Sequence, residues 1–263
     1  MFGRYIFVAQ ISARQQSAYR SELFFRAISM VLFMVVFIAL WSTAYGVTQR
    51  ESLAGHTLAQ IIWYLGMAEA VTLSTSRIFV EISDAVKAGD VAYTLVRPMP
   101  YPLFQVANSL GNSAPRFLLN LLTGVVVVTL ATRSVPGSVP GFLAFLGMAG
   151  LALLMDALVA VLIGLLAFWL EEVMPVYLIY QKLLFSVGGL FLPLETFPDW
   201  LERAARWLPF QLMAYAPARA FVAFDGRQVA QTIGMQLLYV VVLGGVMWGV
   251  WTLAQRRLIV QGG

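Results

Sequence analysis

The feature that most constrains the fold is a series of six apolar segments of roughly membrane-spanning length. A helix needs about 20 mostly apolar residues to cross a bilayer. The six segments are residues 23–45, 58–79, 106–131, 142–170, 176–194 and 233–253. The pattern predicts an all-α membrane protein with six transmembrane helices. With no repeat or soluble segment in the sequence, residues 1–263 are expected to form a single membrane domain.

Composition supports the membrane interpretation and excludes other classes. The 263 residues are 60% hydrophobic and only 11% charged, whereas a soluble domain has about 25% charged residues. The net charge of +4 does not indicate a nucleic-acid partner, because the basic residues are scattered between apolar segments. The lack of cysteine excludes disulfides and thiolate metal sites, and the single His56 makes no metal site by itself.

The sequence lacks the residues that ATP binding or catalysis would need. The two lysines, Lys87 and Lys182, follow Val86 and Gln181, so no Gly-Lys-Ser/Thr phosphate loop is present. An intramembrane protease or acyltransferase would need a nucleophile beside a base, and His56 lies outside the apolar segments. We therefore expect no catalytic residue and no bound cofactor or metal. Such a chain either conducts passively or is the membrane part of a machine driven by another polypeptide.

The distribution of positive charge predicts the orientation. With the N-terminus inside, eleven of the 17 lysines and arginines fall on the cytoplasmic side and six fall outside. Four of those six lie in one long segment, and long segments count weakly in the positive-inside rule. We predict a multi-pass protein with both termini in the cytoplasm.

Residues 1–20 precede the first apolar segment. Phe2, Tyr5, Ile6, Ala9 and Ala13 form an apolar stripe at helical spacing. This pattern is typical of an amphipathic helix lying at the membrane interface. The alternative is a frayed polar tail.

A patterned loop, residues 79–102, follows the second apolar segment. Its charged residues are Glu81, Asp84, Lys87, Asp90 and Arg97. Gly89 breaks the segment, and Asp90 can cap a short helix over residues 91–96. Prolines at 98, 100 and 102 favour extended backbone afterwards. We interpret the loop as a rigid docking projection on the cytoplasmic face, the alternative being an ordinary connector.

Residues 191–228, between the fifth and sixth segments, are too apolar for a solvated loop and too broken for a span. The breaks are at Pro193, Pro198, Pro209 and Pro217. Asp199 can cap a helix over residues 200–207, and a second short helix is expected after Pro217. We predict a re-entrant or surface-lying helical hairpin at the outer leaflet. Phe197 and Trp200 suit the interfacial aromatic belt.

Two acidic residues, Glu69 and Asp156, fall within apolar segments. Intramembrane charges are costly and often functional. Each acid fits a proton relay, a substrate contact or a buried inter-helix pair, or else a structural hydrogen bond of the bundle. Lys182 is expected to snorkel to the cytoplasmic surface near Glu171 and Glu172.

A pair of glycines ends the fifth apolar segment. Gly188 and Gly189 precede Pro193. They suit a gating hinge or plain close packing.

Two motifs resemble a known family. The first is a G-D-x-x-x-x-L-x-R-P pattern after the second segment, and the second is F-L-P-L followed by F-P-x-W-L and L-P-F after the fifth. The first comprises Gly89, Asp90, Leu95, Arg97 and Pro98, and the second comprises residues 191–194, 197–198, 200–201 and 208–210. Together with the order of elements along the whole chain, they resemble the permease subunit of bacterial type-2 ABC exporters.

The resemblance implies a half-transporter in the bacterial cytoplasmic membrane. Such a permease pairs with a second permease, identical or related, and docks separate ABC ATPase subunits that hold ATP and Mg. The substrate expected from the apolar interior is amphipathic: a drug, a lipid, a peptide or a glycan. The rival is a proton- or ion-coupled secondary transporter, which would need several mid-membrane charges and usually an inverted repeat.

The resemblance also assigns roles to residues. The ATPase-coupling residues are Glu81, Asp84, Lys87, Gly89, Asp90, Leu95, Arg97 and Pro98. The residues expected in the translocation path or gate are Glu69, Asp156, Gly188, Gly189, Pro193, Phe197 and Trp200.

Overall fold

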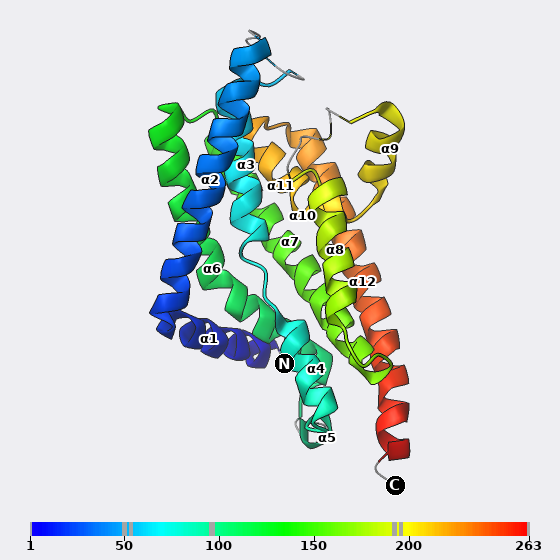
Figure 1. Ribbon diagram of the computed structural model, residues 1–263. Helices are drawn as coiled ribbons and strands as arrows, with labels where there is room; N and C mark the ends of the chain where they lie inside the picture. Colours follow the sequence, from blue (N-terminus) through cyan, green and yellow to red (C-terminus); the bar gives the residue numbers. More distant parts are fainter. Residues whose placement is uncertain are drawn as a thin grey trace.

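The computed structural model describes residues 2–48, 52, 55–94, 98–190, 194 and 197–261. Every element among these residues is a helix, as predicted. Four helices are long and apolar enough to cross a bilayer. They are α2 (Arg20–Thr48), α6 (Tyr101–Thr132), α7 (Val139–Leu165, continued by the 3-10 turn η1, Leu166–Phe168) and α12 (Gly226–Gln261). These helices run the length of the bundle (Figure 1).

The second and fifth predicted spans are shorter helices. α3 (Leu58–Thr72) has 15 residues and α8 (Met174–Val187) has 14, so each rises about 22 Å. The prediction that the second helix continues to residue 79 is wrong, because α3 ends at Thr72 and residues 73–77 form an irregular connector. The count of six transmembrane helices stays a prediction.

The N-terminal helix α1 (Phe2–Ala18) crosses the lower ends of α2 and α6 at a steep angle (Figure 1). It lies directly on α6, where a Cβ added at Gly111 would be 2.3 Å from the carbonyl oxygen of Ala9. Only a glycine allows the two backbones to approach this closely. The predicted helix is therefore present, and its place at a membrane interface remains a prediction.

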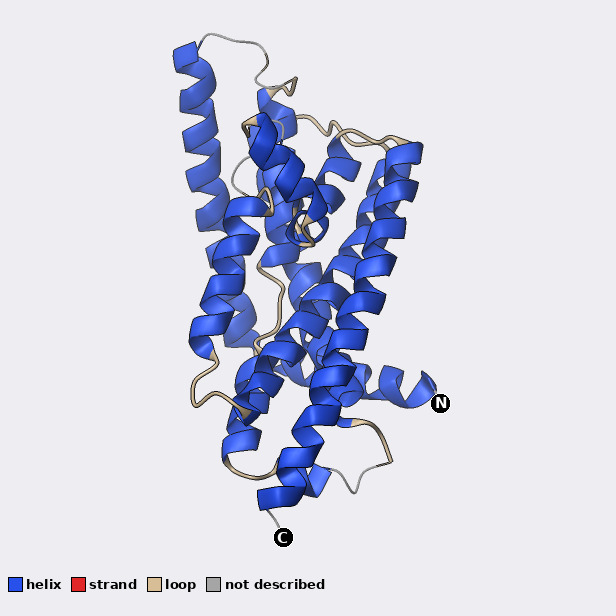
Figure 2. Cartoon of the chain, turned by 90° about the vertical axis from the view of Figure 1, so that its right-hand side faces the viewer, coloured by secondary structure: helices blue, strands red, loops and turns tan. Residues whose placement is uncertain are grey.

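Two short helices, α4 (Ile78–Lys87) and α5 (Val91–Thr94), extend beyond α1 at the end of the bundle that also holds the N- and C-terminal regions (Figures 1 and 2). We call residues 78–94 the projection. The sequence predicted a helix over residues 91–96, of which α5 covers the described part, and it missed α4. Pro102 is also not extended: it lies in the first turn of α6, where its missing N–H is harmless.

The opposite end carries three short helices, α9 (Asp199–Trp207), α10 (Phe210–Met213) and α11 (Tyr215–Val222). α10 and α11 are buried, and α11 packs against α3 and α7, while most of α9 is exposed. The residue before α9 is Pro198 and no side chain caps the helix, so the predicted cap by Asp199 is wrong; Asp199 is the first helical residue. Its carboxylate still lies in the first turn, where negative charge is favourable.

The buried residues form two clusters. The larger joins α2, α3, α7 and α8 with α10 and α11. The smaller joins the projection to α7 and α12 through residues such as Ile78, Ile82, Val91, Leu165 and Trp251. The outer faces of α2 and α12 expose large apolar side chains, for example Phe25 and Val241. Such faces suit contact with lipid.

Candidate functional site

The projection is held to the bundle by the apolar face of α4. Ile78, Phe79 and Ile82 are buried, while Glu81 and Asp84 are exposed on the other side of the helix. The contact with α7 is close, because a Cβ added at Gly164 would be 2.7 Å from the Cβ of Ile82. α4 is thus a short amphipathic helix seated on the long helix α7.

A tight turn joins α4 to α5. Gly89 has a φ of +77°, a left-handed conformation that costs a side-chain-bearing residue about 1–2 kcal/mol. Beyond the turn, Tyr93 is 80% exposed. The turn holds the exposed Lys87 and Asp90 at the outer edge of the projection.

A groove of about 620 Å³ lies between this turn and the end of α7. Lys87 and Gly89 line one side, and Phe168, Trp169 and Glu171 line the other. An ion pair of 2.8 Å between Lys87 Nζ and Glu172 Oε1 joins the two sides. The groove is therefore bounded by mixed charge and by exposed aromatic surface.

The segment after α7 was missed as part of the candidate site, because the sequence interpretation placed residues up to 170 inside the fourth span. In the structure α7 ends at Leu165, and Trp169 and Leu170 are exposed by 38% and 41%. Arg257 of α12 donates to the carbonyl oxygen of Phe168 and lies 5.6 Å from the Trp169 ring centre. The signal in the sequence was the Glu171-Glu172 pair directly after an apolar run.

Most of the predicted coupling residues lie on this projection. Its exposed members are Glu81, Asp84, Lys87, Gly89 and Asp90, and Pro98, which is also exposed, lies after it. Leu95 and Arg97 lie outside the described residues. Glu172 pairs with Lys87, and no ion pair among the described residues joins Lys182 to Glu171 or Glu172.

Glu81 connects the projection to α1 through the side chain of Asn108. Asn108 of α6 donates from Nδ2 to Glu81 Oε2 at 3.4 Å and accepts from the Ser12 hydroxyl at 2.6 Å. Partial burial raises the pKa of the Glu81 carboxyl, and the charge of Arg116 and the bond from Asn108 oppose that rise. The Glu81 carboxylate is therefore linked to α6 through its bond from Asn108, and to α1 through the bond between Asn108 and Ser12.

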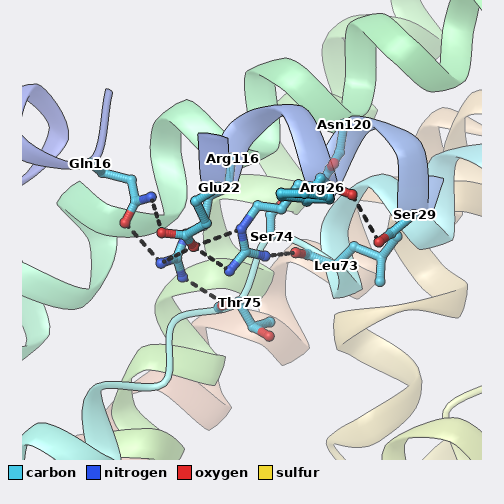
Figure 3. Close-up of polar contacts among 10 residues, drawn as sticks. Gln16, Glu22, Arg26, Ser29, Leu73, Ser74, Thr75, Arg116 and Asn120 are labelled. Atoms are coloured by element: carbon cyan, nitrogen blue, oxygen red, sulfur yellow. Dashed lines mark hydrogen bonds and ion pairs between the residues drawn. The ribbon is translucent and has the colours of Figure 1, made fainter. Parts of the chain in front are cut away.

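A second polar network makes hydrogen bonds to the connector between α3 and α4 (Figure 3). Arg116 of α6 donates to Gln16 of α1 at 2.8 Å, to Glu22 of α2 at 3.1 Å and to the carbonyl of Thr75 at 3.3 Å. Arg26 binds Glu22 at 2.8 Å and donates to the carbonyl of Leu73 at 3.1 Å. Side chains of α2 and α6 thus satisfy connector carbonyls that helical bonding would otherwise satisfy.

Asn120 completes this network from α6. Its Nδ2 donates to the Ser74 hydroxyl at 3.0 Å, and that hydroxyl donates to the carbonyl of Ala70. Three elements therefore fix the position where α3 stops and the chain turns toward the projection. We call residues Gln16, Glu22, Arg26, Arg116 and Asn120 the clamp.

The residues predicted for a path or gate are not gathered in one place. Asp156 is buried in α7, where its Oδ1 accepts from the Tyr180 hydroxyl of α8 at 2.8 Å. This contact is an inter-helix hydrogen bond. Glu69, in α3, is 2% exposed and lines a separate groove with Lys182.

The glycine pair packs tightly between helices. Gly188 accepts from the Tyr215 amide at 3.2 Å, and Gly189 accepts from the Tyr64 hydroxyl. Gly189 has a φ of +76°, and an added Cβ would lie 2.9 Å from Tyr215 Cβ. Phe197 is partly buried against the main core and Trp200 is 67% exposed on α9, while Pro193 lies outside the described residues.

Replacement of Gly89 by alanine is expected to loosen the turn of the projection. Nothing lies within 4 Å of an added Cβ, so the effect comes from backbone strain of about 1–2 kcal/mol. Hydrogen exchange of the amides of residues 86–93 should accelerate by about 5- to 30-fold. Gly147→Ala, equally free of contacts, is the control and should leave these amides unchanged. Unchanged exchange in Gly89→Ala would contradict the assigned strain.

Comparison with known proteins identifies one family. The sequence model of the ABC-2 family transporter proteins matches residues 27–262. That range contains the projection, the groove and two of the five clamp residues, Arg116 and Asn120. No curated protein matches the chain.

Proposed function

Because this chain belongs to the ABC-2 transporter family, we propose that it is the permease subunit of an ATP-driven exporter. Its apolar helices and its family make it a multi-pass membrane protein. We place it in the bacterial cytoplasmic membrane, paired with a second permease that is identical or related. Separate ATPase subunits bind ATP and Mg, and the exported molecule is amphipathic.

The observation that carries the proposal is the two-sided character of the projection. Its exposed side offers Glu81, Asp84 and Lys87, and the adjoining groove offers Trp169. A soluble partner can bind such a surface through charge pairs around an aromatic anchor. The other side is buried against α7 and α12. Force applied by a docked partner would therefore reach two long helices directly.

The position of the projection fits this role. It lies at the same end as the N- and C-terminal regions (Figure 1), and the charge distribution favours a cytoplasmic location for both termini. ATPase subunits would then dock on the side of the membrane where ATP is present. Differential docking in the two nucleotide states would shift the permease between its conformations.

The clamp connects the base of the projection to α2 and α6. Arg26 and Arg116 hold connector carbonyls of Leu73 and Thr75 while they also hold Glu22. Movement of α4 would be passed to α6 and α2 through these bonds. An irregular connector without them would absorb the movement.

A second candidate, a proton- or ion-coupled carrier, is favoured by the buried Glu69. The two functions differ in one test. Transport by a carrier persists when the chain is reconstituted alone. Transport by the proposed exporter requires the ATPase.

Co-purification with an ATPase tests the proposed function. The tagged chain is expressed with its chromosomal neighbours and isolated in a mild detergent, and a separate ATP-binding subunit is expected in the eluate. Reversal of the exposed charges in the variant D84K/K87E should lower its recovery at least about tenfold. Glu202→Lys, on α9 at the other end, is the matched control. A chain that purifies alone and folded, or equal recovery in D84K/K87E, would refute the proposal.

A further inference from the structure

A groove of about 360 Å³ opens between α2, α3 and α8, away from the projection. Its lining consists of Phe33, Glu69, Leu73, Lys182, Phe185 and Ser186. Apolar and aromatic walls with a few polar groups are typical of small-molecule sites, and the volume lies in their usual range. Phe33 lies close to the middle of α2, so the groove lies near the middle of the bundle.

Glu69 forms the base of this groove. Its side chain is buried, with only 2% of the residue exposed. The hydrogen bond that the described residues give its carboxylate comes from Thr72 at 3.4 Å, which is long for a hydroxyl donor. A carboxylate at this depth is costly unless it has a better partner.

Lys182 lies at the rim. Lys182 and its neighbour Ser186 are exposed, and no ion pair within the described parts of the chain involves Lys182. The groove therefore carries an acidic side chain inside and a lysine at its mouth, and the rest of its lining is mostly apolar.

We propose that this groove binds the head group of a zwitterionic amphiphile. The ammonium of the ligand lies against Glu69, and its phosphate or carboxylate lies against Lys182. The apolar chain lies along Phe33 and Phe185. Only the identification of this molecule as cargo rests on the proposed function.

Charge complementarity selects this ligand class. A simple cation would bring its charge toward Lys182, and a simple anion would bring its charge toward Glu69. An uncharged apolar ligand would remove water from both charges without replacing its hydrogen bonds, which is unfavourable. A molecule with both charges satisfies both residues. Direct pairing of Lys182 with Glu69 is the competing arrangement, and it would leave the groove without a preference for zwitterions.

Equilibrium binding to the purified chain tests the inference. The probe is radiolabelled lysophosphatidylethanolamine, and the chain is kept in a neutral maltoside detergent. We expect saturable binding that unlabelled probe displaces and lysophosphatidylglycerol, which lacks the amine, does not. Glu69→Gln and Lys182→Gln should each weaken binding at least about tenfold. Glu202→Gln, which removes an acid on α9, should bind as the native chain does.

Ser186→Phe keeps the inference testable if Glu69→Gln fails to fold. Ser186 is exposed, so the larger ring fits the fold while it fills the groove and leaves both charges in place; binding should again fall about tenfold. Equal binding by Glu69→Gln or Ser186→Phe, or equal displacement by lysophosphatidylglycerol, would overturn the proposal.

Two further measurements separate a bilayer lipid from cargo. An aminophospholipid that co-purifies with the native chain and is lost from Glu69→Gln identifies a bound bilayer lipid. Stimulation of ATP hydrolysis by the probe in the assembled complex identifies cargo. The binding measurement needs no ATPase, so its failure leaves the docking test of the proposed function untouched.

Discussion

Arg116→Ala is expected to lower the free energy of unfolding by about 3 kcal/mol, since removing one partner of a buried ion pair costs about 3–5 kcal/mol. The guanidinium binds Gln16, Glu22 and the carbonyl of Thr75. Alanine leaves the carbonyl of Thr75 and the side-chain oxygen of Gln16 without this donor. The lower end of the range applies because the Glu22 side chain is 40% exposed and keeps Arg26.

Chemical unfolding in detergent, followed by tryptophan fluorescence, measures this loss. The matched control is Arg206→Ala, which breaks a pair with Glu202 on α9 where the arginine side chain is 45% exposed. Such an exposed pair contributes less than about 1 kcal/mol. Arg116→Lys keeps the charge and should lie between the two, because one ammonium cannot reproduce the planar fork. A loss below about 1 kcal/mol in Arg116→Ala would mean that the clamp does not hold the connector.

The features that could be predicted from the sequence are those that depend on the composition of a single continuous segment. Long apolar runs identified α2, α6, α7 and α12, since each run carries its own hydropathy signal. The stripe in residues 1–20 gave α1 for the same reason. The prolines and apolar content of residues 191–228 identified a broken, partly buried segment, although the exact ends of its helices depended on packing.

The connector between α3 and α4 could not be predicted, because what stabilises it comes from distant helices. Residues 73–77 lie outside α3 and α4, and the side chains of Arg26 and Arg116 donate to the carbonyls of Leu73 and Thr75. A local signal existed in Ser74, Thr75 and Ser76, whose side chains compete for backbone hydrogen bonds. Averaging hydropathy over a span-length window concealed it.

The candidate site was half predictable. Charged residues around Gly89 identified the projection, because a turn flanked by charges is a local pattern. Its partner surface, residues 167–171, approaches only through tertiary packing of α4 on α7. The same packing brings Lys87 to Glu172. A single sequence could not choose between Lys87 and Lys182 as the partner of that acid.

Gly164→Ala is expected to separate the projection from α7. Alanine in place of glycine usually stabilises a helix by up to about 1 kcal/mol, but here its Cβ would lie 2.7 Å from Ile82 Cβ and 3.0 Å from two further Ile82 atoms. Overpacking of this kind costs about 1–3 kcal/mol, so the variant should be less stable than the native chain. Gly147→Ala, in the same helix with nothing within 4 Å, should be neutral or more stable.

The double variant G164A/I82A decides whether the contact itself is responsible. Ile82→Ala alone leaves a cavity on α4. In the double variant the two 3.0 Å contacts with Ile82 Cγ2 and Cδ1 are gone, and the remaining Cβ–Cβ contact can relax into the vacated space. The two effects should therefore be non-additive by at least about 1 kcal/mol, measured by unfolding in detergent. In the assembled complex, Gly164→Ala should also reduce transport more than ATP hydrolysis, and I82A should partly restore it. Additive changes in stability would show that α4 and α7 are not coupled through this contact. Movement of the ATPase would then have to reach the membrane helices through the clamp.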